Sequence, residues 1–236
     1  MEKTILIIKN EFNLFLEILF PSKCVGCNIH GQILCKNCIN NLRQAERPTE
    51  SEIFAVYDYR DPIIKKAIWK LKYYHSSQLG QKLGELLYEA FIEDITEIKM
   101  FTKGSPIYVI PVPISHDRKK NRGYNQAEII ARSFVRGCTA TYSRGWTAYV
   151  AVQPLLLKTN IIYKNKNTIP QARLTNRNRR LQNIKNAFSI KNKEQIKDKI
   201  IIVIDDVTTT GGTINEIIKL LKKSGAKKVI GFAVAH

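Results

Sequence analysis

The chain has 236 residues, of which 44% are hydrophobic and 25% are charged. These values are ordinary for a globular protein with one main domain and room for a small appendage, and the chain contains no repeats or low-complexity tracts. Its 38 Lys and Arg against 20 Asp and Glu give a formal net charge of +18, which favours a polyanionic partner such as nucleic acid, or a phosphate-rich ligand. A well-solvated, lysine-rich surface explains part of this excess.

The positive charge is concentrated in the middle of the chain. Between Ser115 and Lys193 there are 17 Lys or Arg and only two acidic residues, Asp117 and Glu128. Random scatter would not gather the excess so strongly. We therefore expect the middle of the chain to build a basic face.

The N-terminal residues 4–20 are apolar enough to be checked for export or membrane insertion. Lys9, Glu11 and Glu17 interrupt the run and no small-residue cleavage site follows, which argues against a signal peptide and against a membrane span. Without an export signal, a reducing cytoplasm is the expected compartment. The apolar positions fit one face of an amphipathic helix docked on its own domain: Ile5, Ile8, Phe12, Phe15, Leu16 and Leu19.

Four of the five cysteines form two CxxC pairs, Cys24 with Cys27 and Cys35 with Cys38, separated by seven residues. Two such pairs suit tetrahedral coordination of one zinc ion by four thiolates. Residues 21–45 are too few to bury a useful core, so the ion would hold the segment folded and would be structural, not catalytic. A redox CxxC and two disulfides are the competing interpretations, but a redox motif normally occurs once.

Apolar periodicity and turn residues predict alternating strands and helices after a polar linker at residues 43–52. The unbroken β-branched run Ile200–Ile204 is typical of a buried parallel strand. This alternation predicts an α/β fold with a parallel sheet in residues 46–236, preceded by a small zinc-binding segment with an N-terminal helix in residues 1–45. In chain order, we expect a strand at 53–59, helices at 62–73 and 79–92, a strand at 107–112, a basic loop at 115–125, a helix at 126–135, strands at 155–163 and 200–204, a helix at 213–223 and a strand at 228–234.

Residues 137–153 do not fit this scheme. A structureless loop of that length is unusual in a compact domain. Either residues 147–152 add a strand, or the segment is disordered.

The segment Ile201–Thr213 contains the most informative motif. A buried strand delivers Asp205 and Asp206 at its C-terminal end, where ligands bind in open α/β sheets. Backbone N–H groups in a small-residue turn, and the positive end of the following helix dipole, form a cradle for phosphate. The turn consists of Val207, Thr208, Thr209, Thr210, Gly211, Gly212 and Thr213.

Two acids beside a phosphate cradle imply that the ligand also has a neutral, hydroxyl-rich part. A ribose with its 5-phosphate in the cradle would place its 2- and 3-hydroxyls near Asp205 and Asp206, and Mg²⁺ on a pyrophosphate group would offset their charge. The segment resembles the phosphoribosyl pyrophosphate (PRPP) signature of type I phosphoribosyltransferases. It lacks the Gly-Lys-Ser/Thr of a Walker A loop and the GxGxxG of a dinucleotide site. The alternative is a Thr/Gly turn that binds nothing.

Motifs along nearly the whole chain resemble the ComF family of competence-associated proteins, the amidophosphoribosyltransferase-like group that includes GntX. Their conjunction is far more specific than any one of them. In order they are the CxxC pairs behind FLEILFPSK, Tyr57 with Trp69-Lys-Leu-Lys72-Tyr-Tyr, Pro111-Val-Pro113, Arg122-Gly-Tyr-Asn-Gln-Ala-Glu128, Pro170-Gln-Ala-Arg-Leu174, Arg180-Leu-Gln-Asn183, Asn186-Ala-Phe188 and the PRPP segment.

The resemblance implies a type I phosphoribosyltransferase-like fold and a set of residue roles. Asp205 and Asp206 would be the catalytic pair that holds the ribose, residues 207–213 would bind PRPP, and Arg122 with Gly123 would lie in the loop facing the pyrophosphate. Residues 170–188 resemble the mobile hood that closes over PRPP, and a solvated or nucleic-acid-facing loop is their alternative. The hood arginines that would neutralise the leaving group are Arg173, Arg177, Arg179 and Arg180.

Three functions remain open from the sequence. The first, which we favour, is PRPP binding with transfer of the phosphoribosyl group, assisted by Mg²⁺, to a nitrogen nucleophile, although no residue stands out as an acceptor-binding base. The second is a regulator that binds PRPP without turning it over. The third is a nucleic-acid-binding module, since the resemblance implies a role in handling single-stranded DNA during natural transformation together with other DNA-uptake proteins. The aromatic residues that would stack on bases, or else lie in the core, are Tyr124, Tyr142, Trp146 and Tyr149.

Overall fold

The computed structural model describes residues 21–46, 52–74, 76–100, 105–143, 155–165 and 184–236. For residues 139–143 it describes the backbone only. The chain divides into two compact units, Met1–Leu42 and Arg43–His236. In the described part of the first unit a short helix, α2 (Lys36–Asn40), carries Cys38. The N-terminal amphipathic helix expected from the sequence lies outside the described residues.

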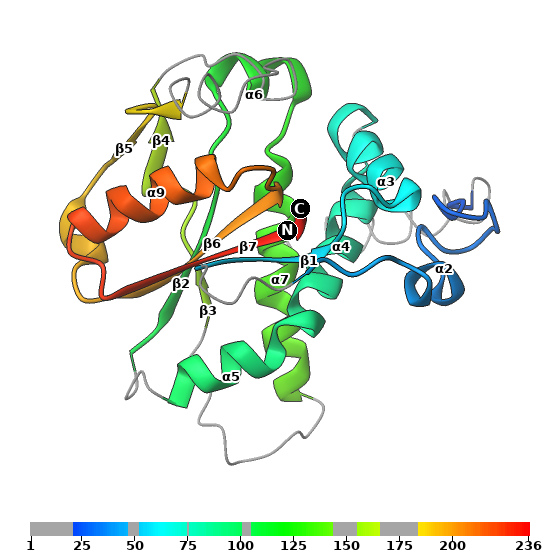
Figure 1. Ribbon diagram of the computed structural model, residues 1–236, viewed down its shortest axis with the longest axis horizontal. Coiled ribbons are helices and arrows are strands. Elements are labelled where there is room, and N and C mark those ends of the chain that lie inside the picture. Colours follow the sequence, from blue (N-terminus) through cyan, green and yellow to red (C-terminus); the bar gives the residue numbers. More distant parts are fainter. Residues whose placement is uncertain (1–20, 47–51, 75, 101–104, 144–154, 166–183) are drawn as a thin grey trace, which may run out of the picture. The chain divides into compact units, whose positions relative to one another are not determined.

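The second unit is built on a parallel five-stranded sheet with the strand order β1-β7-β6-β2-β3. β6 lies at the centre, where Ile204 is in register with Pro111 of β2 and with Phe232 of β7. Because all five strands run the same way, their carboxyl ends gather along one edge of the sheet (Figure 1), and the predicted α/β parallel sheet is confirmed. The strands are β1 (Ile53–Tyr57), β2 (Ile107–Pro111), β3 (Leu155–Leu157), β6 (Ile200–Val207) and β7 (Lys228–Ala235).

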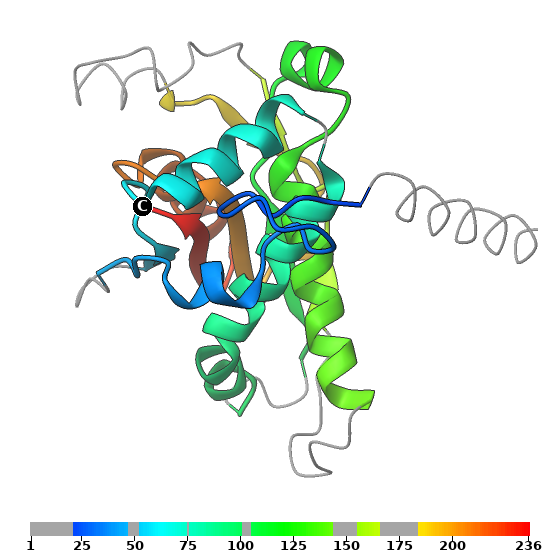
Figure 2. The same cartoon turned by 90° about the vertical axis from the view of Figure 1, so that its right-hand side faces the viewer.

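Helices cover both faces of this sheet. α9 (Gly212–Lys223) packs on one face, and α4 (Ser77–Ala90) and α7 (Gln126–Ser143) lie side by side on the other, as Figures 1 and 2 show from two directions. α4 and α7 approach closely at Gly84, where a Cβ atom would lie only 2.4 Å from the carbonyl oxygen of Ile130. The other helices of this unit are α3 (Pro62–Tyr73), α5 (Ile92–Met100), α6 (His116–Arg122) and the 3-10 helix η2 (Lys193–Ile196).

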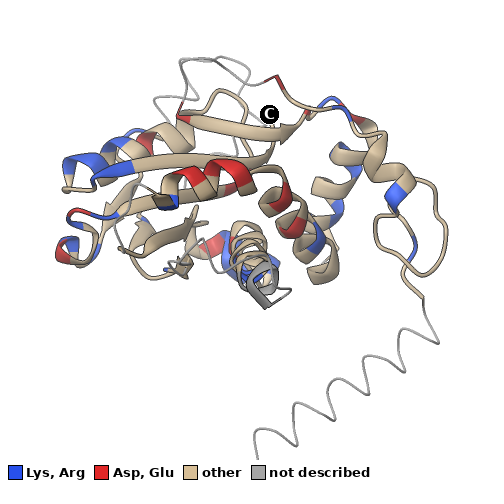
Figure 3. Ribbon diagram, turned by 90° about the horizontal axis from the view of Figure 1, so that it is seen from below, with Lys and Arg blue, Asp and Glu red and all other residues tan. Residues whose placement is uncertain are grey.

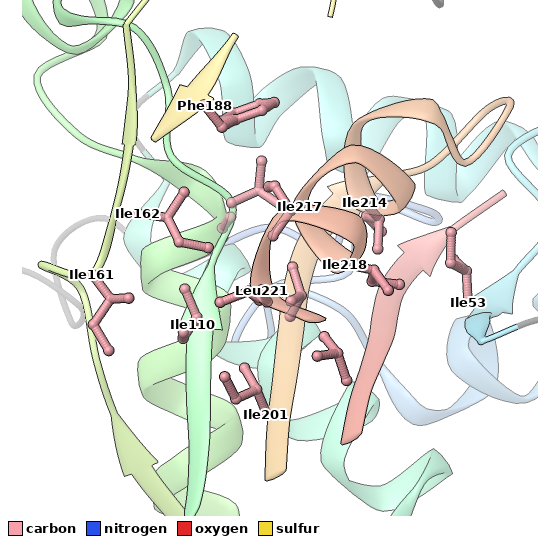
Figure 4. Close-up of a cluster of buried hydrophobic side chains, with 14 of the residues drawn as sticks. Ile53, Ile110, Ile161, Ile162, Phe188, Ile201, Ile214, Ile217, Ile218 and Leu221 are labelled. Atoms are coloured by element: carbon pink, nitrogen blue, oxygen red, sulfur yellow. The ribbon is translucent and has the colours of Figure 1, made fainter. Parts of the chain in front are cut away.

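A small antiparallel pair, β4 (Ile162–Lys164) with β5 (Phe188–Ile190), packs against the outer side of α9. Ile162 and Phe188 join the apolar cluster that α9 forms with the sheet (Figure 4). The helix therefore contributes apolar side chains on two sides, which holds its N-terminus firmly beside the end of β6. The other members of the cluster drawn with labels are Ile53, Ile110, Ile161, Ile201, Ile214, Ile217, Ile218 and Leu221.

The prediction of a basic loop at residues 115–125 is wrong, because α6 occupies most of it. None of its residues is buried, so the helix has no apolar periodicity by which a sequence reading would recognise it. It is favoured instead by its charges: Asp117 lies in the first turn and Arg122 in the last, each at the end of the helix dipole that attracts it. Gly123, with φ at 75°, ends the helix in the left-handed conformation.

The single strand predicted at residues 155–163 is also wrong. The chain leaves the main sheet after β3, bends at Thr159 and Asn160, and enters the second sheet as β4. Turn-forming residues divide an apolar run that reads as one strand. The helix predicted at 79–92 corresponds to α4, whereas α5 was not predicted, and the helix predicted at 126–135 extends to Ser143.

Charge is distributed unequally over the second unit. α5 carries Glu93, Asp94 and Glu97, which appear red in the view from below in Figure 3. α6, at the opposite end of the view in Figure 1, carries Arg118, Lys119, Lys120 and Arg122.

Within the described part of the chain, no helix combines the length and the apolar character needed to cross a membrane.

Candidate functional site

The site is built around Asp205 and Asp206, the last charged residues of β6. The backbone N–H of Asp206 donates to Oδ1 of Asp205 at 2.9 Å, and that of Val207 donates to Oδ1 of Asp206 at 2.8 Å. Burial, and next the charge of Asp206, raise the pKa of Asp205 well above the ordinary value. Asp205 therefore holds its proton more tightly than an exposed aspartate does.

Lys72, from the last turn of α3, neutralises the second acid. Its Nζ lies 3.0 Å from Oδ2 of Asp206, and the side chains of Lys72 and Asp206 are only 26% and 12% exposed. Burial lowers the pKa of Lys72, but the charges of Asp206 and Asp205 outweigh that effect and raise it, so the ammonium stays charged. Figure 1 shows α3 near the carboxyl edge of the sheet.

The position of Lys72 follows from the way α3 is built. Asp61 caps the helix by accepting hydrogen bonds from the N–H groups of Ile63 and Ile64, and Pro62 occupies the first turn. The buried face ends at Leu71, which leaves the next side chain at the rim of the core. Lys72 was part of the motif Trp69-Lys-Leu-Lys72, but sequence reasoning gave it no role. A lysine directly after the last buried position of a helix is the signal that was available.

The Thr/Gly turn after β6 joins the end of the strand to the N-terminus of α9. The N–H of Thr208 donates to the carbonyl oxygen of Ala235 at 2.9 Å, which ties the turn to β7. Gly211 adopts φ of 69° at the N-cap of α9, a conformation that favours glycine, and no side chain caps that helix. The hydroxyl oxygen of Thr210 is buried and has no hydrogen-bond partner among the residues that the structure describes. An uncapped helix N-terminus with an unsatisfied hydroxyl nearby is suited to an anion such as phosphate.

Three cationic side chains lie on the other flank of the acids. Burial, and next the charge of Arg122, lower the pKa of Arg118 on α6. Burial, and next the charge of Arg118, lower the pKa of Lys164 on β4 to about 8, although Asp205 acts in the opposite direction. Cations whose charge lowers the pKa of a neighbouring cation lie close together, and a bound polyanion would relieve this repulsion. Neither Arg118 nor Lys164 was singled out from the sequence.

Arg122, the last residue of α6, is held by two contacts. Nη1 of Arg122 donates to Oε1 of Gln126 at 3.2 Å, and its guanidinium lies 5.6 Å from the centre of the Tyr73 ring. Asn125 accepts from the N–H of Ala127 and donates from Nδ2 to the carbonyl oxygen of Val112 at 3.0 Å. This side chain therefore caps the start of α7 and ties it to the end of β2.

The structure brings together some of the residues expected from the sequence and not others. Asp205, Asp206 and residues 207–213 lie at the carboxyl edge, and Arg122 with Gly123 lies next to Arg118, which interacts with Lys164 beside Asp205. The hood arginines Arg173, Arg177, Arg179 and Arg180 lie outside the described residues, and so do Trp146 and Tyr149 and residues 147–152. The side chain of Tyr142 is likewise not described.

The exposed aromatic residues are not the ones expected. The hydroxyl of Tyr124 donates to the carbonyl oxygen of Leu71, so this ring is held against α3. Instead, Trp69, Tyr73 and Tyr74 are 48%, 60% and 62% exposed, and they are half of the six large hydrophobic side chains that the described residues expose. The Trp69 ring centre lies 6.0 Å from that of Tyr73 and 4.9 Å from that of Tyr74. We call these three residues the aromatic surface.

The four cysteines of the first unit form one cluster. All four Sγ atoms lie within 4.8 Å of one another, and those of Cys27 and Cys35 are 3.6 Å apart. Tetrahedral coordination with Zn–S bonds of about 2.3 Å places sulfur atoms about 3.8 Å apart, so the cluster fits zinc. Burial raises the pKa of Cys24, but N–H groups of Cys27, Cys35 and Gly26 together lower it to about 6. The pKa of Cys38 is raised to about 12, chiefly by its hydrogen bond with Cys35, so the four thiols share protons in the absence of metal.

Comparisons with known proteins match both parts of the chain. The family model described as "Phosphoribosyl transferase domain" matches residues 120–236. Competence protein F of Haemophilus influenzae is 31% identical over 214 residues, which are 90% of this chain and 84% of that protein. DNA utilization protein YhgH of Escherichia coli O157:H7 is 26% identical over 209 residues, covering 87% of this chain and 80% of that protein.

Solved structures show a more distant likeness. Glutamine PRPP amidotransferase from B. subtilis, complexed with ADP and GMP, is 15% identical with a TM-score of 0.37, over 67% of this chain and 26% of that chain. The match thus spans only about a quarter of that enzyme.

The relative from H. influenzae extends through the cysteine cluster as well as the sheet, since it covers nine-tenths of the chain. Taken with the matching domain model and the four clustered cysteines, this shows that the chain belongs to the ComF/YhgH competence family, with a phosphoribosyltransferase domain and a four-cysteine cluster near its N-terminus.

Proposed function

We propose that the protein binds PRPP at residues 205–213 and transfers its phosphoribosyl group to a nitrogen nucleophile. The observation that carries the proposal is the arrangement at the end of β6. An acid pair, half-buried Asp205 and buried Asp206, stands between the helix N-terminus at Gly211 and a group of neighbouring cations, Arg118, Arg122 and Lys164. PRPP has hydroxyls between two phosphate-bearing ends, and this site has the complementary order of groups.

In this proposal each part of the site meets one part of PRPP. The 5-phosphate lies in the turn of residues 207–213, and the ribose hydroxyls face Asp205 and Asp206, whose carboxylate oxygens accept hydrogen bonds from them. The pyrophosphate lies toward Arg118, Arg122 and Lys164, whose charges stabilise the negative charge that develops as it leaves. The hood arginines Arg173, Arg177 and Arg180 are proposed to join them.

Magnesium is proposed to accompany PRPP, because Mg²⁺ prefers carboxylate and phosphate oxygens and is commonly held by one or two carboxylates plus substrate phosphates. When bound, it would neutralise charge on the departing pyrophosphate. The residues that would hold it are Asp205 and Asp206. Zinc is proposed as a structural ion on Cys24, Cys27, Cys35 and Cys38, where four sulfur ligands leave no open position for catalysis.

A thermal-shift experiment tests the PRPP site. PRPP with Mg²⁺ should raise the melting temperature of the wild type, because a ligand that binds only the folded state stabilises it, and the double variant Asp205→Asn/Asp206→Asn should lose the shift. A wild type that does not respond would refute the proposal.

Pyrophosphate release then separates an enzyme from a sensor. With PRPP, Mg²⁺ and a panel of purines and pyrimidines, a transferase releases pyrophosphate when one acceptor is supplied. Thermal stabilisation without release from any member of a broad panel would favour a regulator that binds PRPP without turning it over.

A second function, binding of single-stranded nucleic acid, is favoured by the aromatic surface. Base–aromatic stacking is tolerant of sequence, and single-strand binding sites combine exposed aromatic rings with a basic groove. Trp69, Tyr73 and Tyr74 offer the rings, and α3 and α6 carry the charges beside them: Lys65, Lys66, Lys70, Arg118, Lys119, Lys120 and Arg122. The names of the relatives, "Competence protein F" and "DNA utilization protein", agree with a DNA partner.

In this view the protein acts in the cytoplasm on single-stranded DNA taken up during natural transformation, together with other DNA-uptake proteins. Binding of a labelled oligonucleotide tests the DNA partner. Affinity should fall steeply as the salt concentration rises from about 50 to about 200 mM, because phosphate contacts release counterions. Affinity that barely changes with salt would contradict a phosphate-tracking site.

A further inference from the structure

The exposed ring of Tyr73 lies where the aromatic surface meets the cations of the candidate site. Its centre is 6.0 Å from that of Trp69, and the guanidinium of Arg122 lies 5.6 Å from the same centre. Burial and the charge of Arg122 lower the pKa of Arg118, whereas Tyr73 acts in the opposite direction, so Arg118 also lies within electrostatic reach of this ring. One ring therefore belongs to the aromatic surface and borders the cationic group at the same time.

The end of α3 is tied to the acid pair, which keeps this ring beside the site. Lys72, the residue before Tyr73, has its Nζ 3.0 Å from Oδ2 of Asp206. Leu71 is fully buried, and its carbonyl oxygen accepts a hydrogen bond from the hydroxyl of Tyr124, just before α7. Moving Tyr73 away from Asp206 would break a largely buried ion pair and a hydrogen bond, which costs free energy. Ligands on the aromatic surface and at the acid pair are thus held close together.

The two ligands proposed for these surfaces need the same cations. Arg118 and Arg122 are assigned to the pyrophosphate of PRPP, and they also lie beside Tyr73, on which a base would stack. A stacked base brings the phosphates of its own strand with it, because single-strand sites place the backbone along a basic groove beside the aromatic rings. Pyrophosphate and strand phosphates at the same two guanidiniums would repel each other, since like charges at short range do so.

Other cations make this competition partial. α3 also carries Lys65, Lys66 and Lys70, which PRPP does not contact in the proposed binding mode. A DNA strand can therefore keep part of its ionic contacts while PRPP occupies the site. The affinity for DNA should fall when PRPP binds, but it should not vanish.

We propose that PRPP and single-stranded DNA bind this protein antagonistically, because the pyrophosphate and the strand compete for Arg118 and Arg122 beside Tyr73. The antagonism rests on both proposed functions and adds a regulatory relation between them. Linkage makes it reciprocal: if PRPP weakens DNA binding by a given factor, DNA weakens PRPP binding by the same factor. A chain that carries a strand holds PRPP less tightly, and a rise in PRPP concentration favours release of the strand.

Fluorescence anisotropy with a labelled oligothymidylate and the full chain, at constant Mg²⁺ concentration and ionic strength, tests the proposal. Saturating PRPP should raise the Kd for the oligonucleotide at least about fivefold, which is within the usual range for coupled sites. Ribose 5-phosphate at the same concentration has no pyrophosphate and should leave the Kd unchanged. An unchanged Kd with PRPP, or an equal rise with both compounds, overturns the proposal.

Three variants check that the effect comes from this site. Arg118→Gln removes one shared cation and should reduce the PRPP-induced rise in Kd at least about twofold. Lys219→Gln, which removes an exposed charge from α9, should keep the full rise. Asp205→Asn/Asp206→Asn should not bind PRPP, so PRPP should leave its Kd for DNA unchanged. A rise that is equal in the wild type and all three variants overturns the proposal.

The PRPP-induced thermal shift of the wild type, measured without DNA, separates the antagonism from the functions on which it rests. A thermal shift together with a Kd that PRPP does not change overturns the antagonism alone. The absence of both a thermal shift and a change in Kd overturns PRPP binding, and the antagonism with it. A thermal shift in a protein that does not bind the oligonucleotide overturns the DNA function and the antagonism but leaves the PRPP site.

Discussion

The ammonium of Lys72 and the carboxylate of Asp206 are 134 positions apart in the chain and 3.0 Å apart in the structure. The pair joins the end of α3 to the end of β6, and Tyr73, the next residue of α3, lies under the guanidinium of Arg122. Two neighbouring residues of α3 thus reach the acid pair and the cationic helix α6. Because α3 also carries Trp69, the aromatic surface is attached directly to the candidate PRPP site.

Lys72→Met should destabilise the protein by about 1–3 kcal/mol, because Asp206 would keep a poorly solvated charge next to Asp205 without its partner. Urea unfolding at neutral pH measures the loss. Lys66→Met on the same helix is the matched control, since Lys66 is exposed and should change the free energy of unfolding by less than about 0.5 kcal/mol. Equal stability of the two variants would show that the ion pair contributes nothing.

The acid pair should make stability fall as the pH rises. The pKa of Asp205 is raised in the folded protein, so the folded state binds the proton more tightly than the unfolded state, in which aspartate has a pKa of about 3.9. The stabilisation is present below that unfolded value and is lost as the pH rises through the folded pKa. Asp205→Asn cannot ionise. The free energy of unfolding of this variant should therefore increase relative to that of the wild type as the pH rises through that window.

Denaturant unfolding at a series of pH values from about 4 to about 8 follows this difference. Glu97→Gln on α5 is the control, because Glu97 is exposed and removal of its charge should shift the curve little. A difference between wild type and Asp205→Asn that stays constant with pH would contradict the raised pKa.

The cysteine cluster should hold about one zinc ion per chain. Cys35→Ser removes a ligand and should reduce the bound metal to near zero, as measured by elemental analysis of the purified protein. Cys138→Ser is the matched control, because Cys138 is buried in the second unit and lies outside the cluster. Loss of zinc from both variants, or a wild type free of zinc after growth with the metal, would exclude the structural zinc site.

Removal of the aromatic surface should weaken single-stranded DNA binding. The double variant Trp69→Ala/Tyr73→Ala loses two exposed rings, and base–aromatic stacking contributes about 1–3 kcal/mol per base. Fluorescence anisotropy with a labelled oligonucleotide should therefore show an affinity at least about tenfold lower, with a salt dependence close to that of the wild type. Tyr163→Ala, which removes a 40% exposed ring from β4, should bind as the wild type does. A similar loss of affinity in both variants would show that the aromatic surface is not a specific binding site for single-stranded DNA.

Gly211→Ala should damage the phosphate turn. Gly211 adopts φ of 69°, and an added Cβ would lie 3.1 Å from Cδ1 of Ile53 and 3.0 Å from Nδ2 of Asn215. The left-handed conformation alone costs a residue with a Cβ about 1–2 kcal/mol, so thermal unfolding should shift down and the PRPP-induced shift should shrink. Gly225→Ala is the comparison: its φ is 95°, but its Cβ would find only ordinary contacts, so it should lose stability and keep the PRPP response.

The sequence was most informative where local chemistry and burial agree. α3 begins and ends where predicted, because Asp61 and Pro62 mark its start and an apolar stripe marks its buried face. β6 follows from an unbroken β-branched run at the centre of the sheet. α6 was missed because no residue of it is buried, and the junction of β3 and β4 was missed because one apolar run serves two sheets.

The candidate site divides in the same way. Asp205, Asp206 and the Thr/Gly turn are one continuous segment, whose order of buried strand, acids and glycines is visible in the sequence itself. The cysteine cluster is similar, since two CxxC pairs close in the chain are close in space. For both, the amino-acid sequence alone determined which residues belong together, because contacts between near neighbours require little more than the local backbone.

Only the tertiary structure decided which distant side chains surround those segments. Lys72, Arg118 and Lys164 come from a helix end, an exposed helix and a strand of the second sheet, and their approach to the acids depends on how the parallel sheet orders β1, β6 and β2. The same packing joins the hydroxyl of Tyr124 to the carbonyl oxygen of Leu71 and leaves Trp69 exposed. Residue type reports what a side chain can do, whereas neighbours and burial are set by long-range packing, which no local pattern encodes.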